Sequence, residues 1–295
     1  MHIKLFKNPI GIIGLLILLG LCYLGFAATS AYYLDHSRME LQVPANMHTV
    51  SGVIKVSSNS AQKIRLRVLP KLWQLNPDGV LVYQDAPLTG FNLLDNIGVN
   101  PREFDLLPGR SRLVRFLVKT PEQMQTAEYP FQLYFEPVNL LEGGNTSEST
   151  GVSHVLDVIP VFTTTVYVYQ GNPMPDIKVE KFNCAYQPKN AHFDVDLDLK
   201  NEGTKHARLF GNLVLSAEDG PNAHTPLDVL HMQNSTLIIV FPNAQRLVKN
   251  SLSPTIPLTL KPGSYQLQLR LMDERNIQPA IQSTCHLKVE TSMKN

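Results

Sequence analysis

Residues 100 to 116 read NPREFDLLPGRSRLVRF, and this stretch separates two interpretations, an anion-binding patch and a β-strand. Successive side chains of a strand point to opposite faces, so Arg110 and Arg112 would lie on one face and Arg115 on the other. The three arginines therefore do not form one patch. We interpret residues 110 to 119 as a strand, with Val114 and Phe116 on the face opposite Leu113 and Arg115.

The same alternation recurs along the chain after residue 32, and no segment there sustains a helical apolar period. A turn is expected at Asn76-Pro77-Asp78-Gly79, because proline presets φ and glycine supplies a positive φ. The Gly- and Pro-rich residues 170 to 176 read as a linker, after which the strand pattern restarts. We expect an all-β fold class with two tandem immunoglobulin-like β-sandwich domains, residues 32–171 and 172–295. The predicted strands are 48–58, 62–75, 79–84, 110–119, 129–138 and 154–170 in the first, and 177–186, 191–200, 207–216, 235–241, 264–273 and 283–290 in the second.

The N-terminus carries two lysines, then an uncharged apolar run from Ile10 to Ala28, then small residues up to Ala31. This order is typical of an export signal, so residues 1–31 are predicted to be a signal peptide cleaved after Ala31. The apolar run is also long enough to cross a bilayer if it is retained as a membrane anchor. Both alternatives place the rest of the chain outside the cytoplasm.

Two cysteines remain in the exported part, Cys184 and Cys285. An oxidising compartment and an even count favour a disulfide between them over two free buried thiols. The bridge would tie the first strand of the second domain to its last.

The sequence contains no motif typical of an enzyme's active site, and we expect neither catalytic activity nor a cofactor. The nine histidines lack metal-ligand spacing, and no nucleotide-binding or nucleophile motif is present. Asp194, Asp196 and Asp198 alternate with apolar residues, which indicates a solvated strand face rather than a calcium site. With 26 Lys plus Arg against 25 Asp plus Glu, the chain lacks the basic excess of a nucleic-acid-binding protein.

Three segments in order resemble the PapD-like periplasmic chaperones of bacterial pilus assembly. LDHSR (34–38) is similar to the family's first strand, and KLWQLNPDGVLVY (71–83) to its tryptophan-containing turn region. NPREFDLLPGRSRLVRF resembles the family signature, and AEYPFQLYFEPV (127–138) follows it at the right distance. The resemblance covers about residues 32–171, whereas the second domain matches only in size and strand rhythm.

The resemblance implies a periplasmic protein of two immunoglobulin-like domains with a cleft between them. Such chaperones lend pilus subunits the last long strand of domain one, here residues 155–169, in donor-strand complementation. Pilus or fibre subunits, and an outer-membrane usher, are the implied partners. Arg38 matches the arginine that holds the subunit's terminal carboxylate, and the alternative is an exposed arginine on an edge strand. The donor face stays open, because a slip of one residue swaps the faces. The candidate donor residues are Val158, Ile159, Val161, Phe162, Thr163 and Thr165.

The sequence departs from the family in the donor strand. Family members carry a lysine there as a second carboxylate anchor, whereas this chain has Thr165 or its neighbour Val166 at that place and no lysine between Val155 and Gln170. The leading hypothesis is a chaperone of pilus or surface-fibre subunits. The alternative is a membrane-anchored immunoglobulin-like structural or adhesive surface protein.

Overall fold

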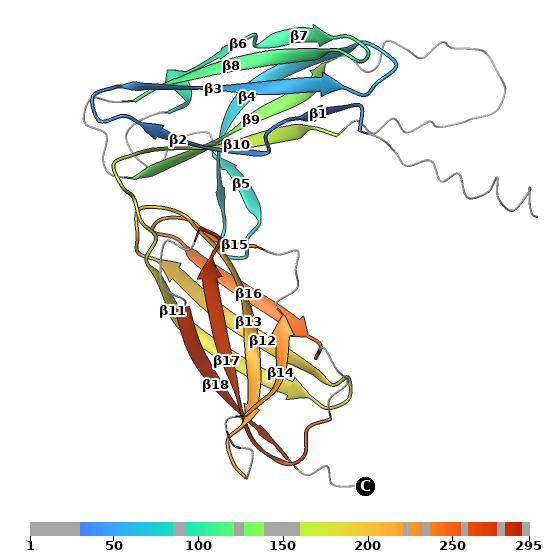
Figure 1. Cartoon of the computed structure of the whole chain (residues 1–295), viewed down its shortest axis with the longest axis vertical. Helices are drawn as coiled ribbons and strands as arrows, with labels where there is room; N and C mark the ends of the chain where they lie inside the picture. Colours follow the sequence, from blue (N-terminus) through green and yellow to red (C-terminus); the bar gives the residue numbers. More distant parts are fainter. Residues whose placement is uncertain are drawn as a thin grey trace, which may run out of the picture.

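The computed structural model describes residues 30–84, 93–120, 127–138, 160–220, 223, 225–231, 237–254, 259–275 and 281–290. Two β-sandwiches follow one another along the chain (Figure 1). The predicted fold class, all-β with two tandem immunoglobulin-like β-sandwiches, is confirmed. The apolar run at the N-terminus lies outside the described residues, and among those that are described no helix has the length and hydrophobicity to cross a membrane.

The first sandwich consists of two facing sheets. One has the strand order β1-β3-β8-β6, and the other has the order β2-β10-β9-β4-β5, with β7 paired to β4. A short 3-10 helix, η1, precedes β6. The elements are β1 (Tyr32–Leu34), β2 (Arg38–Val43), β3 (Thr49–Ser58), β4 (Ile64–Leu75), β5 (Leu81–Gln84), η1 (Leu94–Asn96), β6 (Ile97–Asn100), β7 (Glu103–Leu106), β8 (Ser111–Lys119), β9 (Glu128–Val138) and β10 (Phe162–Gln170).

The second sandwich pairs a three-stranded sheet, β11-β12-β16, with a sheet of order β14-β13-β17-β18, to which β15 adds by pairing with β13. Each sandwich encloses its own apolar core between its two sheets. The elements are β11 (Ile177–Gln187), β12 (His192–Asn201), β13 (Ala207–Ala217), β14 (Pro226–His231), β15 (Ile238–Val240), β16 (Gln245–Leu252), β17 (Gly263–Asp273) and β18 (Ile281–Val289).

Period-two alternation explains why these segments are strands. In β8, Val114 and Phe116 are buried, whereas Leu113 and Arg115 are exposed, so the two pairs lie on opposite faces as expected from the sequence. Burial of the apolar face of a strand stabilises the fold by roughly 25 cal/mol for each Å² of apolar surface that is removed from water. Arg112 and Arg115 are both exposed but lie on opposite faces of the strand, which agrees with the expectation that the arginines do not form one patch.

Two contacts stabilise the second sandwich, and the first of them, the disulfide, was predicted from the sequence. Cys184 on β11 and Cys285 on β18 form a disulfide, which joins the two sheets at their edges. Tyr265, at the start of β17, donates its hydroxyl hydrogen bond to the Lys261 carbonyl oxygen at 3.0 Å. That contact has the form of the tyrosine corner of immunoglobulin-like sandwiches.

The β4–β5 hairpin connects the two sandwiches. Its turn is the predicted one, because Gly79 has a φ of +80° and donates its N–H to the Asn76 carbonyl at 2.8 Å. The Pro77 carbonyl at the tip accepts from the Leu247 N–H at 2.7 Å and from Arg246 Nη1 at 3.0 Å. In Figure 1 this hairpin reaches from the first sandwich to the second.

An aromatic cluster fills the junction behind the hairpin. Trp73 of β4 meets Phe241 edge to face, with ring centroids 4.9 Å apart. Tyr167 of β10 stacks on His206 at 4.0 Å. Because these rings are buried by contacts between the two sandwiches, the junction holds a small apolar core of its own.

Candidate functional site

The edge of β10 is open along its first residues. β10 pairs antiparallel with β9 from Phe162 to Tyr169, but its parallel pairing with β2 begins only at Thr165. Within the described part of the chain, residues 162–164 therefore have a strand partner on one side only. Such an edge presents main-chain N–H and C=O groups that pair readily with another strand.

The packing of β10 settles which of its faces points outward. Thr164, Val166 and Val168 are fully buried, and Phe162 packs against the core of the first sandwich. The alternate residues face away from that core, and Val161 is 47% exposed.

Of the six candidate donor residues, Val161, Thr163 and Thr165 therefore share the outward face. Phe162 points into the chain's own core and is not free to enter a partner. Val158 and Ile159 lie outside the described residues.

Tyr32 anchors the start of β10. Its buried hydroxyl accepts a hydrogen bond from the Phe162 N–H at 3.2 Å and lies in contact with the Phe135 and Pro160 carbonyl oxygens. Burial raises the pKa of Tyr32 to about 12, so the hydroxyl stays protonated. The contact holds the first residues of β10 beside β9, where their other edge stays open.

Arg38 lies at the inner end of this open edge. It is the first residue of β2, and its register partner on β10 is Thr165. The structure thus brings together the predicted carboxylate anchor and the position where the resembling family carries a lysine. Thr165 supplies a hydroxyl there, which accepts a hydrogen bond from Gln132 at 3.3 Å, and it brings no charge.

Arg38 binds a carboxylate of the same chain. Its Nη1 and Nη2 donate to the two oxygens of Glu274 at 3.2 and 3.0 Å. Arg208 of β13 donates through Nε to Glu274 Oε2 at 2.5 Å. The hydrogen bonds from Arg38 and Arg208 lower the pKa of Glu274 to about 2, and the bond to Glu274 raises the pKa of Arg38. The sequence pattern of the second sandwich did not identify Arg208 or Glu274 as residues of the site.

These residues line a cleft between the two sandwiches with a volume of about 530 Å³. That size is typical of small-ligand sites. The indole N–H of Trp73 is buried and has no hydrogen-bond partner among the described residues. The lining residues are Asp35, His36, Ser37, Arg38, Trp73, Thr165, Tyr167, Arg208, Ile239 and Glu274.

Polar contacts fix the wall of the junction beside the cleft. Glu128 of β9 and His206 are both fully buried, and Glu128 Oε1 lies 2.6 Å from His206 Nδ1. Burial raises the pKa of Glu128 to about 8 and lowers that of His206 to about 3. The contact is therefore a carboxylic acid donating to a neutral imidazole near neutral pH. Lys205 pairs with Glu40 across the same junction at 3.2 Å.

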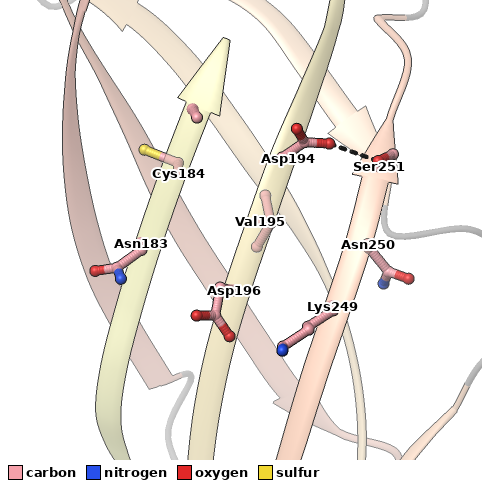
Figure 2. Close-up of a pocket in the computed structure, with 9 residues that line it drawn as sticks. Asn183, Cys184, Asp194, Val195, Asp196, Lys249, Asn250 and Ser251 are labelled. Carbon is pink, nitrogen blue, oxygen red and sulfur yellow. Dashed lines mark hydrogen bonds between the residues drawn. The ribbon is translucent and has the colours of Figure 1, made fainter. Parts of the chain in front are cut away.

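A shallow depression on the second sandwich contains the acidic strand face. It crosses β11, β12 and β16, and Asp194 accepts a hydrogen bond from the Ser251 hydroxyl at 2.5 Å (Figure 2). Asp196 pairs with Lys181 at 2.7 Å, and Asp198 accepts from Gln245 at 2.8 Å. The described residues contain no group of three or more His, Cys, Asp or Glu side chains arranged to hold a metal ion. Each aspartate is engaged by a neighbouring side chain, as on a solvated strand face.

No protein-family model matches the chain, and no curated protein matches it. The solved structures to which it is similar include fimbrial chaperones and their complexes. One is the chaperone–tip adhesion subunit pre-assembly complex of the archaic chaperone-usher Csu pili of Acinetobacter baumannii, with 12% identity, 88% of this chain and 100% of that chain covered, and a TM-score of 0.47. Another is the chaperone–tip adhesin complex of CFA/I fimbriae biogenesis, with 12% identity, 88% and 99% covered, and a TM-score of 0.47.

A third is the Salmonella enterica SafA pilin in complex with the SafB chaperone, with 11% identity, 88% of this chain and 97% of that chain covered, and a TM-score of 0.41. All three TM-scores lie below 0.5, so the similarity is one of strand arrangement and carries no correspondence between individual residues.

Proposed function

We propose that the chain is a periplasmic chaperone that binds pilus or surface-fibre subunits by donor-strand complementation. The open edge of β10 is the observation that carries the proposal, since residues 162–164 pair with β9 and, in the described part of the chain, with no strand on the other side. The ordered sequence segments that resemble the PapD-like chaperones support the same role.

The edge offers both components of strand addition. Main-chain groups of residues 161–164 would pair with a subunit strand, and the outward side chains of Val161, Thr163 and Thr165 would fill the groove of an incomplete subunit sheet. The inward face of β10 stays in the core of the chaperone, so lending the strand requires no unfolding. Reversible pairing of this kind needs neither a catalytic group nor a cofactor.

Arg38 gives the bound strand a fixed end. A subunit strand that runs along β10 toward Thr165 arrives at the Arg38 guanidinium, because the two residues are register partners. A guanidinium grips a terminal carboxylate through two parallel hydrogen bonds. The carboxylate would thereby set the register of the subunit strand against the edge. We expect hand-over to an outer-membrane usher as the next step of such a pathway.

Affinity capture from the periplasm of the organism of origin tests this function. The wild-type chain is compared with Val161→Lys, which adds a charge to the outward face of β10, and with the control Val53→Lys, which changes an exposed valine on β3 of the opposite sheet. We expect the wild type and the control to recover a β-rich secreted subunit and Val161→Lys to lose it. Recovery of no such subunit, together with unchanged surface fibres after deletion, would contradict the proposal.

N-terminal sequencing of the exported chain separates the proposal from the alternative of an anchored surface protein. A mature chain that begins near Tyr32 has lost the apolar segment, as a periplasmic chaperone requires. A chain that keeps residues 1–31 and captures no subunit favours the anchored protein.

A further inference from the structure

Two arginines from different sandwiches hold one carboxylate in the cleft. Arg38 binds Glu274 through both guanidinium nitrogens at 3.2 and 3.0 Å, and Arg208 binds Glu274 Oε2 at 2.5 Å. Arg208 and Glu274 belong to the second sandwich, on and beside the neighbouring strands β13 and β17. The geometry shows that this pair of guanidinium groups accommodates a carboxylate between them.

The surrounding acids are occupied elsewhere, which leaves the two arginines with a surplus of positive charge. Asp273 pairs with Arg275 at 3.2 Å, and Glu40 pairs with Lys205 at 3.2 Å. Asp35, which also lines the cleft, contacts His36 at 2.9 Å and accepts the Lys55 N–H. Within the described part of the chain, Glu274 is the one carboxylate bonded to both guanidinium groups, so the three side chains keep a net positive charge that attracts an incoming anion.

Glu274 is held loosely enough to be displaced. Its side chain is 36% exposed and that of Arg38 is 33% exposed, and ion pairs open to solvent stabilise a fold only slightly. The Arg208 side chain is less open, at 17% exposed, so it would stay in place when Glu274 leaves. Trp73, whose indole N–H is buried, lines the same cleft.

We propose that Arg38 and Arg208 together bind the terminal carboxylate of a captured strand, and that Glu274 occupies this site in the free protein until the strand displaces it. The inference rests on the proposed strand-binding function and deepens it. Arg208 supplies the second cation from the second sandwich, where β10 carries the uncharged Thr165. In the free protein the Glu274 carboxylate therefore occupies the anion site. Binding of the partner replaces it with the partner's terminal carboxylate.

Two variants change the site in opposite directions. Arg208→Gln removes the second cation, whereas Glu274→Gln removes the competing charge and keeps a side chain of nearly the same shape. Arg270→Gln is the matched control, because Arg270 lies exposed on β17 and makes no ion pair with any described residue. Thermal melting of each variant verifies that it is folded.

The probe is a short synthetic peptide of alternating valine and threonine that ends in a free carboxylate, compared with the same peptide ending in an amide. Binding is measured with the full exported chain through the fluorescence of Trp73, the only tryptophan. We expect the wild type to prefer the carboxylate peptide and Arg208→Gln to bind it about tenfold more weakly, the scale of one charged hydrogen bond. Glu274→Gln should bind it about tenfold more tightly, and Arg270→Gln should match the wild type.

The amide peptide distinguishes a failure of the two-arginine site from a failure of strand binding. Its affinity should be the same in all four proteins, because it carries no charge for the arginines. If Arg208→Gln keeps the full carboxylate preference, or Glu274→Gln gains no affinity, the two-arginine site is wrong while strand binding stands. If neither peptide binds any of the four proteins, strand capture itself is contradicted.

Discussion

Arg38 and Glu274 face each other across the junction of the two sandwiches and form a bidentate ion pair between residues 236 positions apart in sequence. Arg38 is the first residue of β2, next to the free edge of β10, and Glu274 directly follows β17 of the second sandwich. The pair therefore couples the proposed binding edge to the second sandwich. A partner that engages Arg38 has to compete with this internal carboxylate.

Arg38→Ala should weaken subunit binding by roughly 1.5 to 3 kcal/mol, the usual contribution of a charged hydrogen bond. Stability should fall by less than about 1 kcal/mol, because the lost ion pair is partly exposed and Glu274 keeps its bond to Arg208. Calorimetric titration of a purified subunit and a thermal melt measure the two quantities. Unchanged subunit affinity would assign Arg38 to the ordinary surface of an edge strand.

Substitutions on the two faces of β10 should separate binding from folding. Thr163→Asp changes the outward face, so we expect stability within about 0.5 kcal/mol of the wild type and loss of subunit binding. Val166→Asp places an unpaired charge in the core, where Val166 is fully buried, and the first sandwich should not fold. Circular dichroism melts and subunit capture report the two effects. A fully active Thr163→Asp protein would contradict the assignment of the outward face.

The buried Glu128–His206 pair predicts a pH range of maximal stability. Folding raises the pKa of Glu128 from its usual 4.5 to about 8 and lowers that of His206 from 6.5 to about 3. Between pH 4.5 and 6.5 the pair holds one proton in both states, so it adds no pH dependence. Between pH 6.5 and about 8 only the folded pair keeps the proton, and between about pH 3 and 4.5 the unfolded pair binds an extra one. Stability should therefore fall on both sides, at about 1.4 kcal/mol per pH unit.

Glu128→Gln isolates the alkaline side of this profile. The glutamine amide can still donate to His206 Nδ1, but it carries no group that titrates near pH 8. Urea unfolding at several pH values should show a flat profile above pH 6.5 for this variant, whereas its stability should already fall below pH 6.5, because only the unfolded His206 takes up a proton there. An identical decline of the variant and the wild type above pH 6.5 would assign that decline to other groups.

Removing the disulfide should destabilise the second sandwich. Cys184 and Cys285 are separated by 101 residues and connect its two sheets, so the bridge restricts a long loop of the unfolded chain. The double variant Cys184→Ala, Cys285→Ala should lose about 2 to 5 kcal/mol. Differential scanning calorimetry should show a lower transition temperature for the second sandwich and little change in the first. Equal transition temperatures in the variant and the wild type would contradict a stabilising bridge.

The sequence predicted the strands whose faces differ in polarity. β8 and β12 alternate cleanly, so their approximate bounds and the division of their residues between two faces were expected. β16 was missed, because QRLVKNSL buries only Val248 and Leu252 among polar residues. β6 and β7 were missed because four residues are too few to establish a period.

The sequence predicted only the part of the site that is formed by neighbouring strands of one sheet. The resemblance pointed to Arg38 and to the place of Thr165, and the structure makes them register partners. The face of β10 could not be chosen from the sequence, because both faces carry apolar residues and the core decides between them. Arg208 and Glu274 were not predicted, since nothing in the sequence states how the second sandwich is oriented against the first.

Hydrogen–deuterium exchange of the chain with and without a captured subunit tests the central claim most directly. If β10 lends its open edge, the amides of Val161 and Thr163 should become protected in the complex, while those of β12 in the second sandwich should exchange as in the free protein. A stable complex in which the amides of residues 161–164 exchange at their free rates would contradict donor-strand complementation by this chain.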